Sequence, residues 1–361
     1  MTANRIVIVT GDNRLSEALA SALVSALSNE TAPCSIVAME TTDIAALSAD
    51  ARNKVLIFNT ALADETTIAT LRKTRKDFYV VGVRHSVGLD PTAQYTQALE
   101  LLKKTSMNLV LAIDSLSGHS LIASPEEYPY GQSTRLLETI NFLAKMVASR
   151  RKNRFTRSTV VPADKVAWTS EAVPANLRAV VNHCIERGAY KPVLGKTAGH
   201  FAVKLNDKEI LTSIRKSNFN DLNNVGLVRV ESVGDDEVIA HGARPSVGGQ
   251  SQRQIFAKHK ETNIAHFHCP LKSDAPLRQE IPVRDQWPNE CGSHECGANT
   301  SNGLHEVDLG EGHSLKVVFL DNHGPNIVFG QETPAEKVIS FIDANFDLSA
   351  KTGGLLAHGM H

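Results

Sequence analysis

The sequence lacks an excess of charge of either sign, and it lacks any long apolar run. Its 38 Lys and Arg residues nearly balance 39 Asp and Glu residues, which gives a net charge of −1. A chain of this kind has no electrostatic footprint for nucleic acid or for a membrane surface. No apolar run approaches the roughly 18 residues of a membrane span. The sequence therefore predicts that neither nucleic acid nor a membrane is a partner.

Cysteine is scarce as well. The chain has five, an odd number that does not suggest a disulfide framework. Its N-terminus enters an apolar strand without the charged start and cleavage site of a signal peptide. Both features predict a cytoplasmic protein. Cys291 and Cys296 flank His294. Because three ligands so close in one loop rarely reach tetrahedral geometry, free thiols or a redox-sensitive pair are favoured over a second metal site.

A length of 361 residues exceeds what one core comfortably fills, and it predicts two domains. In residues 1–150, short apolar runs that suit buried parallel strands alternate with helical patterns. The first helical pattern has leucines four apart on one face: Leu15, Leu19, Leu23 and Leu27. This alternation predicts a doubly wound parallel sheet with right-handed crossovers.

The two halves are joined by a basic run, residues 149–157. Such a run could touch RNA or an acidic lipid, but it is more typical of a solvated helix end followed by a linker. Pro174 then opens a helix that Gly188 ends. The predicted division is a Rossmann-like domain over 1–155, a second α/β domain over 165–340, and a C-terminal helix and loose tail over 341–361.

The second half contains a histidine pattern that is typical of metal sites. His266 and His268 stand two apart in an apolar segment, so on a strand both side chains point to one face. A third histidine, His323, follows in residues 321–324 (Asp-Asn-His-Gly). Two imidazoles on a strand with a third from another strand would hold a divalent ion and leave one position open. Structural histidines are the alternative.

Residues 174–330 resemble the class II aldolase/adducin family. The matching pieces stand in family order: residues 199–204 (Gly-His-Phe-Ala-Val-Lys), 209–213, 220–222, 242–246 (Gly-Ala-Arg-Pro-Ser), the helix 252–258, and 319–324. The resemblance implies an aldolase-like α/β domain in which His266, His268 and His323 bind zinc or another divalent metal. It also implies a homo-oligomer with closed symmetry.

The departures from the family pattern concern its acid/base and phosphate groups. Where the family has a glutamate, this chain has Gln250, which could orient a substrate or water in the active site by hydrogen bonds but whose amide cannot exchange a proton near neutral pH. His200 replaces an asparagine that binds substrate phosphate. Arg215 and Lys216 stand in the phosphate turn, either as anion contacts or as solvated turn residues, and Ser246 is a further candidate for holding an anionic group. His200, His241 or a neighbouring subunit would then move the proton.

Residues 1–150 resemble phosphopantothenoylcysteine synthetase, a nucleotide-using enzyme of coenzyme A synthesis. The matching segments are residues 60–64, 81–83, 101–104 and 108–114, and either Lys103 or Lys104 would occupy the place of the family's lysine. The glycine-rich phosphate loop is missing, because Asp12 follows Gly11 directly. We therefore expect the ligase reaction to be lost, while weak nucleotide binding stays open. A generic Rossmann domain is the alternative.

Two functions follow from these resemblances. The first is a zinc-dependent class II aldolase-like lyase, epimerase or decarboxylase that stabilises the enediolate of a small hydroxy-carbonyl substrate. The second is a catalytically degenerate binding or assembly protein, as in the adducin branch. Retention of the three histidines favours the first, and loss of the glutamate favours the second.

Overall fold

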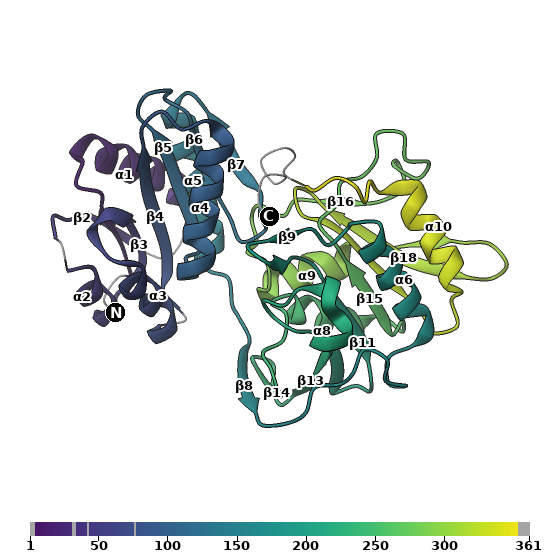
Figure 1. Ribbon diagram of the computed structural model, residues 1–361. Coiled ribbons are helices and arrows are strands. Elements are labelled where there is room, and N and C mark those ends of the chain that lie inside the picture. Colours follow the sequence, from purple (N-terminus) through teal and green to yellow (C-terminus); the bar gives the residue numbers. More distant parts are fainter. Residues whose placement is uncertain (1–3, 31–33, 42, 76, 353–361) are drawn as a thin grey trace. The chain divides into compact units, whose positions relative to one another are not determined.

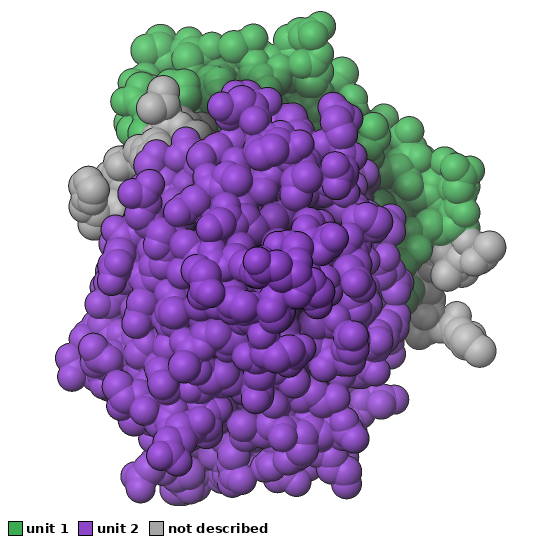
Figure 2. All heavy atoms as spheres, turned by 90° about the vertical axis from the view of Figure 1, so that its right-hand side faces the viewer, with its two compact units in different colours: residues 1–152, 355–359 green, residues 153–354, 360–361 purple. Residues whose placement is uncertain are grey.

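The computed structural model describes residues 4–30, 34–41, 43–75 and 77–352, and it divides into two compact units (Figure 1). The N-terminal unit is Met1–Lys152, and the C-terminal unit begins at Asn153 and extends to Gly354 (Figure 2). No helix in the described part of the chain combines the length and the apolar character that crossing a membrane requires.

The N-terminal unit is a seven-stranded sheet with helices on both faces. Its elements are β1 (Asn4–Val9), α1 (Asn13–Leu27), β2 (Cys34–Ala38), α2 (Ile44–Ala49), β3 (Asn53–Asn59), the 3-10 turn η1 (Thr60–Leu62), α3 (Glu65–Thr74), β4 (Tyr79–Ser86), α4 (Pro91–Thr105), β5 (Leu109–Asp114), β6 (Ser120–Ala123), β7 (Pro129–Ser133) and α5 (Leu136–Arg150). The strand order is β2-β1-β3-β4-β5-β6-β7, and β1 to β5 are parallel. The predicted Rossmann-like sheet is confirmed.

The sequence did not predict the last two strands. β6 pairs antiparallel with β5, and β7 pairs antiparallel with β6. The link from β5 to β6 is a tight turn in which Gly118 has φ +70°. A link this short can only reverse the chain, because a parallel neighbour needs a crossover of a dozen or more residues.

The C-terminal unit is a ten-stranded, mainly antiparallel sheet between two helical layers. Its elements are β8 (Arg157–Val161), α6 (Ala175–Glu186), β9 (Pro192–Val193), β10 (Lys196–Thr197), β11 (His200–Lys204), β12 (Glu209–Ser213), η2 (Phe219–Asp221), α7 (Leu222–Val225), β13 (Leu227–Ser232), β14 (Glu237–His241), α8 (Gly249–Lys258), β15 (Asn263–His266), β16 (Val283–Arg284), α9 (His294–Gly303), β17 (His305–Asp308), β18 (Ser314–Leu320), β19 (Gly324–Phe329) and α10 (Ala335–Asn345). The large sheet has the order β16-β18-β19-β15-β11-β12-β13-β14-β8, with β17 beside β18, and a separate pair is formed by β9 and β10.

Side chains that alternate along the strands of the large sheet form one hydrophobic core on each of its faces. Phe201, Ala265 and Ile327 face one side and pack with α6 and α10. Ala202 and Ile264 face the other side and pack against α8. Strand residues two apart share a face, so the second side also carries the side chains of positions 200 and 266. The histidines therefore lie on the α8 face of the sheet.

The end of the described chain is held in place. The expected loose tail would include Lys351 and Thr352, but both residues are buried. After α10, residues 346–352 return along the segment that follows β15: the backbone of Phe346 bridges to Leu271, and the Thr352 N–H donates to the His268 carbonyl. Residues 353–361, the rest of the predicted tail, lie outside the described residues.

Candidate metal centre

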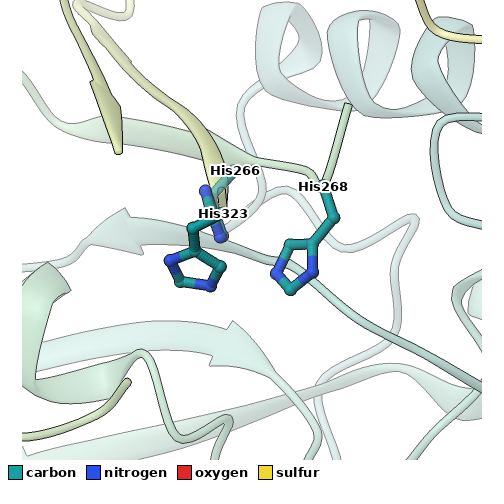
Figure 3. Close-up of side chains that lie close together, drawn as sticks. All are labelled: His266, His268 and His323. Carbon is teal, nitrogen blue, oxygen red and sulfur yellow. The ribbon is translucent and has the colours of Figure 1, made fainter. Parts of the chain in front are cut away.

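The centre is formed by three histidines from the end of β15, the segment that follows it, and the turn between β18 and β19. His266 is the last residue of β15, His268 follows two residues later, and His323 lies in the turn that leads into β19. Figure 3 shows the three side chains close together. Each offers a ring nitrogen within 4.8 Å of the others, and all three residues are buried.

Two glycines allow neighbouring backbone to approach residues 266–268 closely. Gly324 has φ +135°, and a Cβ there would lie 2.2 Å from the Phe267 carbonyl oxygen. Gly199 has φ +101°, and a Cβ there would lie 2.6 Å from the His266 carbonyl oxygen. Any other side chain would push the neighbouring backbone away, because real Cβ contacts do not reach such distances. The glycine after His323 and the glycine before His200 therefore help to shape the site.

The hydrogen bonding of His266 fixes its tautomer. Its Nδ1 lies 2.7 Å from the Pro325 carbonyl oxygen, which only accepts, so Nδ1 carries the proton. Its Nε2 is buried and has no hydrogen-bond partner among the described residues. Burial lowers the pKa of His266 to about 4, although the bond to Pro325 opposes this shift. A buried, neutral imidazole with one unpartnered nitrogen is what a divalent metal requires of its ligand.

The other two rings complete a set of three imidazoles. Ring centroids are 5.1 Å apart between His266 and His268, 4.7 Å between His266 and His323, and 4.5 Å between His268 and His323. Among the residues that the structure describes, no carboxylate or thiol joins this group. Imidazole nitrogens suit zinc and related ions, and three protein ligands leave a position for water or substrate.

His200 borders the centre but is held by its own partner. It pairs in register with His266, and their ring centroids are 4.7 Å apart. Its Nδ1 lies 2.9 Å from the amide nitrogen of Gln252, which donates to it. Burial, followed by the neighbouring His266, lowers the pKa of His200 well below its usual value. His200 is therefore neutral near pH 7 and a weak base.

Sequence reasoning overlooked two amides on this face. Gln252 and Asn326 are buried, and the amide oxygen of each has no partner among the described residues. Asn326 pairs in register with His266, so both side chains leave the same face of the sheet. The available signal was a polar side chain at a buried position of an apolar strand, three residues after His323. Buried oxygens left without donors are suited to meet a bound hydroxyl or water.

Gln250 lies in a different cluster. Its Oε1 accepts from the Thr156 hydroxyl at 2.6 Å, and its Nε2 lies 3.2 Å from Nδ1 of His294. Nε2 of His294 in turn lies 2.9 Å from Asp236. These contacts join α8, α9 and the segment before β8. The side chain that replaces the family's glutamate is thus engaged between helices, and none of these contacts leads to the three histidines.

Ser246, Arg215 and Lys216 lie on two neighbouring backbone segments. The Arg215 N–H donates to the Arg244 carbonyl, and the Ser246 N–H donates to the Ser213 carbonyl, both at 2.9 Å. Arg215 and Lys216 are exposed. The structure therefore brings these predicted substrate residues together, and an anion contact there stays a prediction. His241 lies on β14, which is four strands away from β15 in the same sheet. At the usual strand spacing, the two strands are about 19 Å apart.

The predicted nucleotide lysines lie at the amino edge of the N-terminal sheet. Lys103 and Lys104 are in the last turn of α4, where Lys103 pairs with Glu127 at 2.7 Å and Lys104 with Glu65 at 3.7 Å. Ligands of open α/β sheets bind at the opposite, carboxyl edge. At that edge, the Asp12 carboxylate caps α1 by accepting from two backbone N–H groups. Its negative charge occupies the place where a phosphate would bind.

The cysteines do not form a second metal cluster in the described chain. Within the described residues, Cys291 and Cys296 form no disulfide, and the His294 side chain contacts Gln250, Thr156 and Asp236. The Cys296 sulfur instead lies 3.8 Å from the side-chain oxygen of Gln286.

Comparison with known proteins gives distant structural matches. No family model matches the chain, and no curated protein matches it. YgbL of Escherichia coli, a candidate aldolase/epimerase/decarboxylase, is 16% identical over 46% of this chain and 85% of its own, with a TM-score of 0.34. An L-fuculose 1-phosphate aldolase is 13% identical over 46% and 80%, with a TM-score of 0.32. A DNA/pantothenate metabolism flavoprotein from Streptococcus pneumoniae is 14% identical over 40% and 96%, with a TM-score of 0.29. At these identities and scores the functional argument rests on the geometry of this chain.

Proposed function

We propose that the chain is a divalent-metal-dependent enzyme of the class II aldolase type. It would act as a lyase, epimerase or decarboxylase on a small hydroxy-carbonyl substrate and stabilise the enediolate. One observation carries the proposal: His266, His268 and His323 place ring nitrogens within 4.8 Å of one another in a buried site that contains no carboxylate among its described ligands.

Each part of the site has a separate task in this proposal. A bound zinc or similar ion supplies Lewis-acid stabilisation of the negative charge on a substrate carbonyl oxygen. His266, His268 and His323 would hold it through their ring nitrogens. Gln252 and Asn326, whose buried amide oxygens lack donors, orient substrate hydroxyl groups. Arg215 or Lys216 would bind an anionic group of the substrate.

Gln250 and His200 are both poor candidates for the group that transfers a proton. Gln250 cannot exchange a proton, and its amide is bound to Thr156 and His294. His200 is neutral, with a lowered pKa and a hydrogen bond to Gln252. We therefore propose that a neighbouring subunit supplies the proton-transfer group. This requires a homo-oligomer with closed symmetry, and light scattering that gives a monomer at micromolar concentration would contradict it.

The second candidate is a binding or assembly protein that keeps the fold and the metal site without chemistry. The engagement of Gln250 between α8 and α9 favours it, because no acid or base then stands in the glutamate's place. Both candidates predict a bound metal. They differ in whether the loaded protein turns over a substrate.

Metal content and turnover together test the proposal. Protein purified without chelator should contain about one equivalent of metal per chain, and His268→Ala should nearly abolish it. His305→Ala is the control, because His305 is exposed on β17. Aldol, epimerase and decarboxylase substrates are then screened with zinc, cobalt and manganese. Turnover that disappears in His268→Ala supports the enzyme, whereas a filled site without turnover supports the second candidate. A parent protein that binds no metal contradicts both.

A further inference from the structure

Gln286 is a buried residue that links the turn after β16 to the metal centre. It is 1% exposed, and its side chain contacts two different segments. Its Oε1 lies 3.3 Å from Nδ1 of His323, and its Nε2 donates to the Asn289 carbonyl oxygen at 2.5 Å. Neither the His-x-His pattern nor the family resemblance indicated a role for this residue.

The contact of Gln286 with Asn289 determines which group donates in its contact with His323. The Asn289 carbonyl only accepts hydrogen bonds, so the group of Gln286 that faces it must be the NH₂. The amide oxygen then faces His323, and because an amide oxygen only accepts, Nδ1 of His323 must carry the proton. The lone pair of this imidazole is thereby assigned to Nε2, the nitrogen that remains for a metal.

His266 is oriented by the same principle but by a different group. There, the Pro325 carbonyl accepts from Nδ1 and leaves Nε2 unprotonated. Both second partners are neutral, a peptide carbonyl for His266 and an amide for His323. Metal-binding histidines depend on such partners for their tautomer and ring orientation.

Packing restricts the freedom of the Gln286 side chain. The Cys296 sulfur lies 3.8 Å from Oε1 and 3.7 Å from Nε2, and the Ser251 hydroxyl lies 3.9 Å from the same sulfur. Cys296 is itself fixed near the start of α9, where the Ser293 side chain caps its N–H at 3.0 Å. The layer formed by α8 and α9 thus supports the amide that faces His323.

We propose that Gln286 is a positioning residue of the metal centre, which presents Nε2 of His323 to a divalent ion. The inference rests on the proposed metal-dependent function. It predicts that metal affinity depends on an acceptor at position 286 rather than on the volume of the side chain there.

Three full-length variants separate the acceptor from the volume. Gln286→Leu keeps a similar size and removes the acceptor. Its Kd for Zn²⁺, measured by chelator competition, should rise by about 10- to 100-fold. Gln286→Glu keeps an acceptor and should recover most of the affinity, although a carboxylate facing the Asn289 carbonyl should lower its Tm. Gln254→Leu is the matched control, because the Gln254 side chain donates to the His294 carbonyl at 2.9 Å in the same helical layer. It should bind Zn²⁺ like the parent.

The visible absorption of bound Co²⁺ provides a second readout that does not depend on turnover. Gln286→Leu should change the band and Gln254→Leu should not. Zn²⁺ binding by Gln286→Leu at parental affinity would overturn the inference while leaving the metal site intact. Equal weakening in both leucine variants would also overturn it, because general loosening of the layer would then suffice. A parent that binds no metal removes the inference together with the proposed function. If Gln286→Leu does not fold, Gln286→Asn replaces it in the comparison, because the shorter side chain moves the amide oxygen away from His323.

Discussion

Gln250 illustrates how contacts decide the role of a single residue. Its side chain joins Thr156 to His294, and all three lie in the contact between α8, α9 and the segment before β8. Replacing Gln250 with Ala should leave the metal content unchanged and lower the free energy of unfolding by about 1–3 kcal/mol, because buried groups lose their partners. Metal analysis and urea unfolding measure the two quantities. Loss of metal in this variant would place Gln250 in the metal centre after all.

His294 makes the stability of the protein depend on pH. Burial lowers its pKa below the ordinary value of 6.5, although the neighbouring Asp236 opposes the shift. The unfolded chain therefore takes up a proton at a higher pH than the native chain does, so the free energy of unfolding should fall as pH drops below about 6.5. Urea unfolding between pH 8 and pH 5 measures the fall. In His294→Gln the fall should be smaller, and an unchanged profile would argue against this cause.

At the residue scale, sequence reasoning could identify the histidines but not the groups around them. His266 and His268 follow from strand alternation, and the third histidine from the Asn-His-Gly segment. Gln286 lies 37 positions before His323 in a segment without regular structure, so only tertiary contact connects them. Gln250 was expected to orient a substrate because of its place in the family motif. Gln252, two positions later on α8, is the residue that contacts His200.

The turn between β18 and β19 depends on Gly324. An alanine Cβ there would lie 2.2 Å from the Phe267 carbonyl oxygen, next to His268, and φ is +135°. Gly324→Ala should therefore destabilise the C-terminal unit by about 1–3 kcal/mol or more and weaken metal binding, because β19 must move away from the His268 segment. Gly312→Ala is the control, since Gly312 has φ +78° but open space around it. Thermal unfolding and chelator competition should show a much smaller effect in the control.

The segment after α10 contacts two of the three histidines. The Thr352 N–H donates to the His268 carbonyl, and the Thr352 hydroxyl donates to the His323 carbonyl, both at 3.1 Å. Thr352→Val keeps the shape but loses the hydroxyl, which should cost about 1 kcal/mol and up to about fivefold in metal affinity. Thr333→Val is the control, because the buried Thr333 hydroxyl donates to the Ser314 carbonyl instead. Equal metal affinity in parent and Thr352→Val would show that this bond does not hold the site.

At the scale of elements, the regular parts of the fold could be predicted and the irregular parts could not. Apolar runs such as β3 and β5 indicate buried parallel strands, and the helix after Pro174 follows from its apolar face. The reversal at Gly118 and the return of residues 346–352 leave no periodic signal. The reversal and the return both depend on tertiary packing, because each covers a surface that the other elements leave exposed.

At the scale of the whole molecule, each unit has its own sheet and its own buried core. Among the described residues, the three histidines of the candidate centre contact His200, Gln286, Pro325 and Thr352, which belong to the C-terminal unit. A ligand stabilises only the unit whose native state binds it. The metal should therefore act on one unit of the chain and not on the other.

Calorimetry can test this directly. We expect two unfolding transitions, since two-state behaviour is a property of single domains. Zn²⁺ at about 100 times its Kd should stabilise the C-terminal unit by about 2.7 kcal/mol, which raises that Tm by about 5–10 °C and leaves the other unchanged. His268→Ala should show both transitions without the shift. A single transition that moves as a whole with Zn²⁺ would instead mean that the units unfold together, and the metal would then stabilise the entire chain.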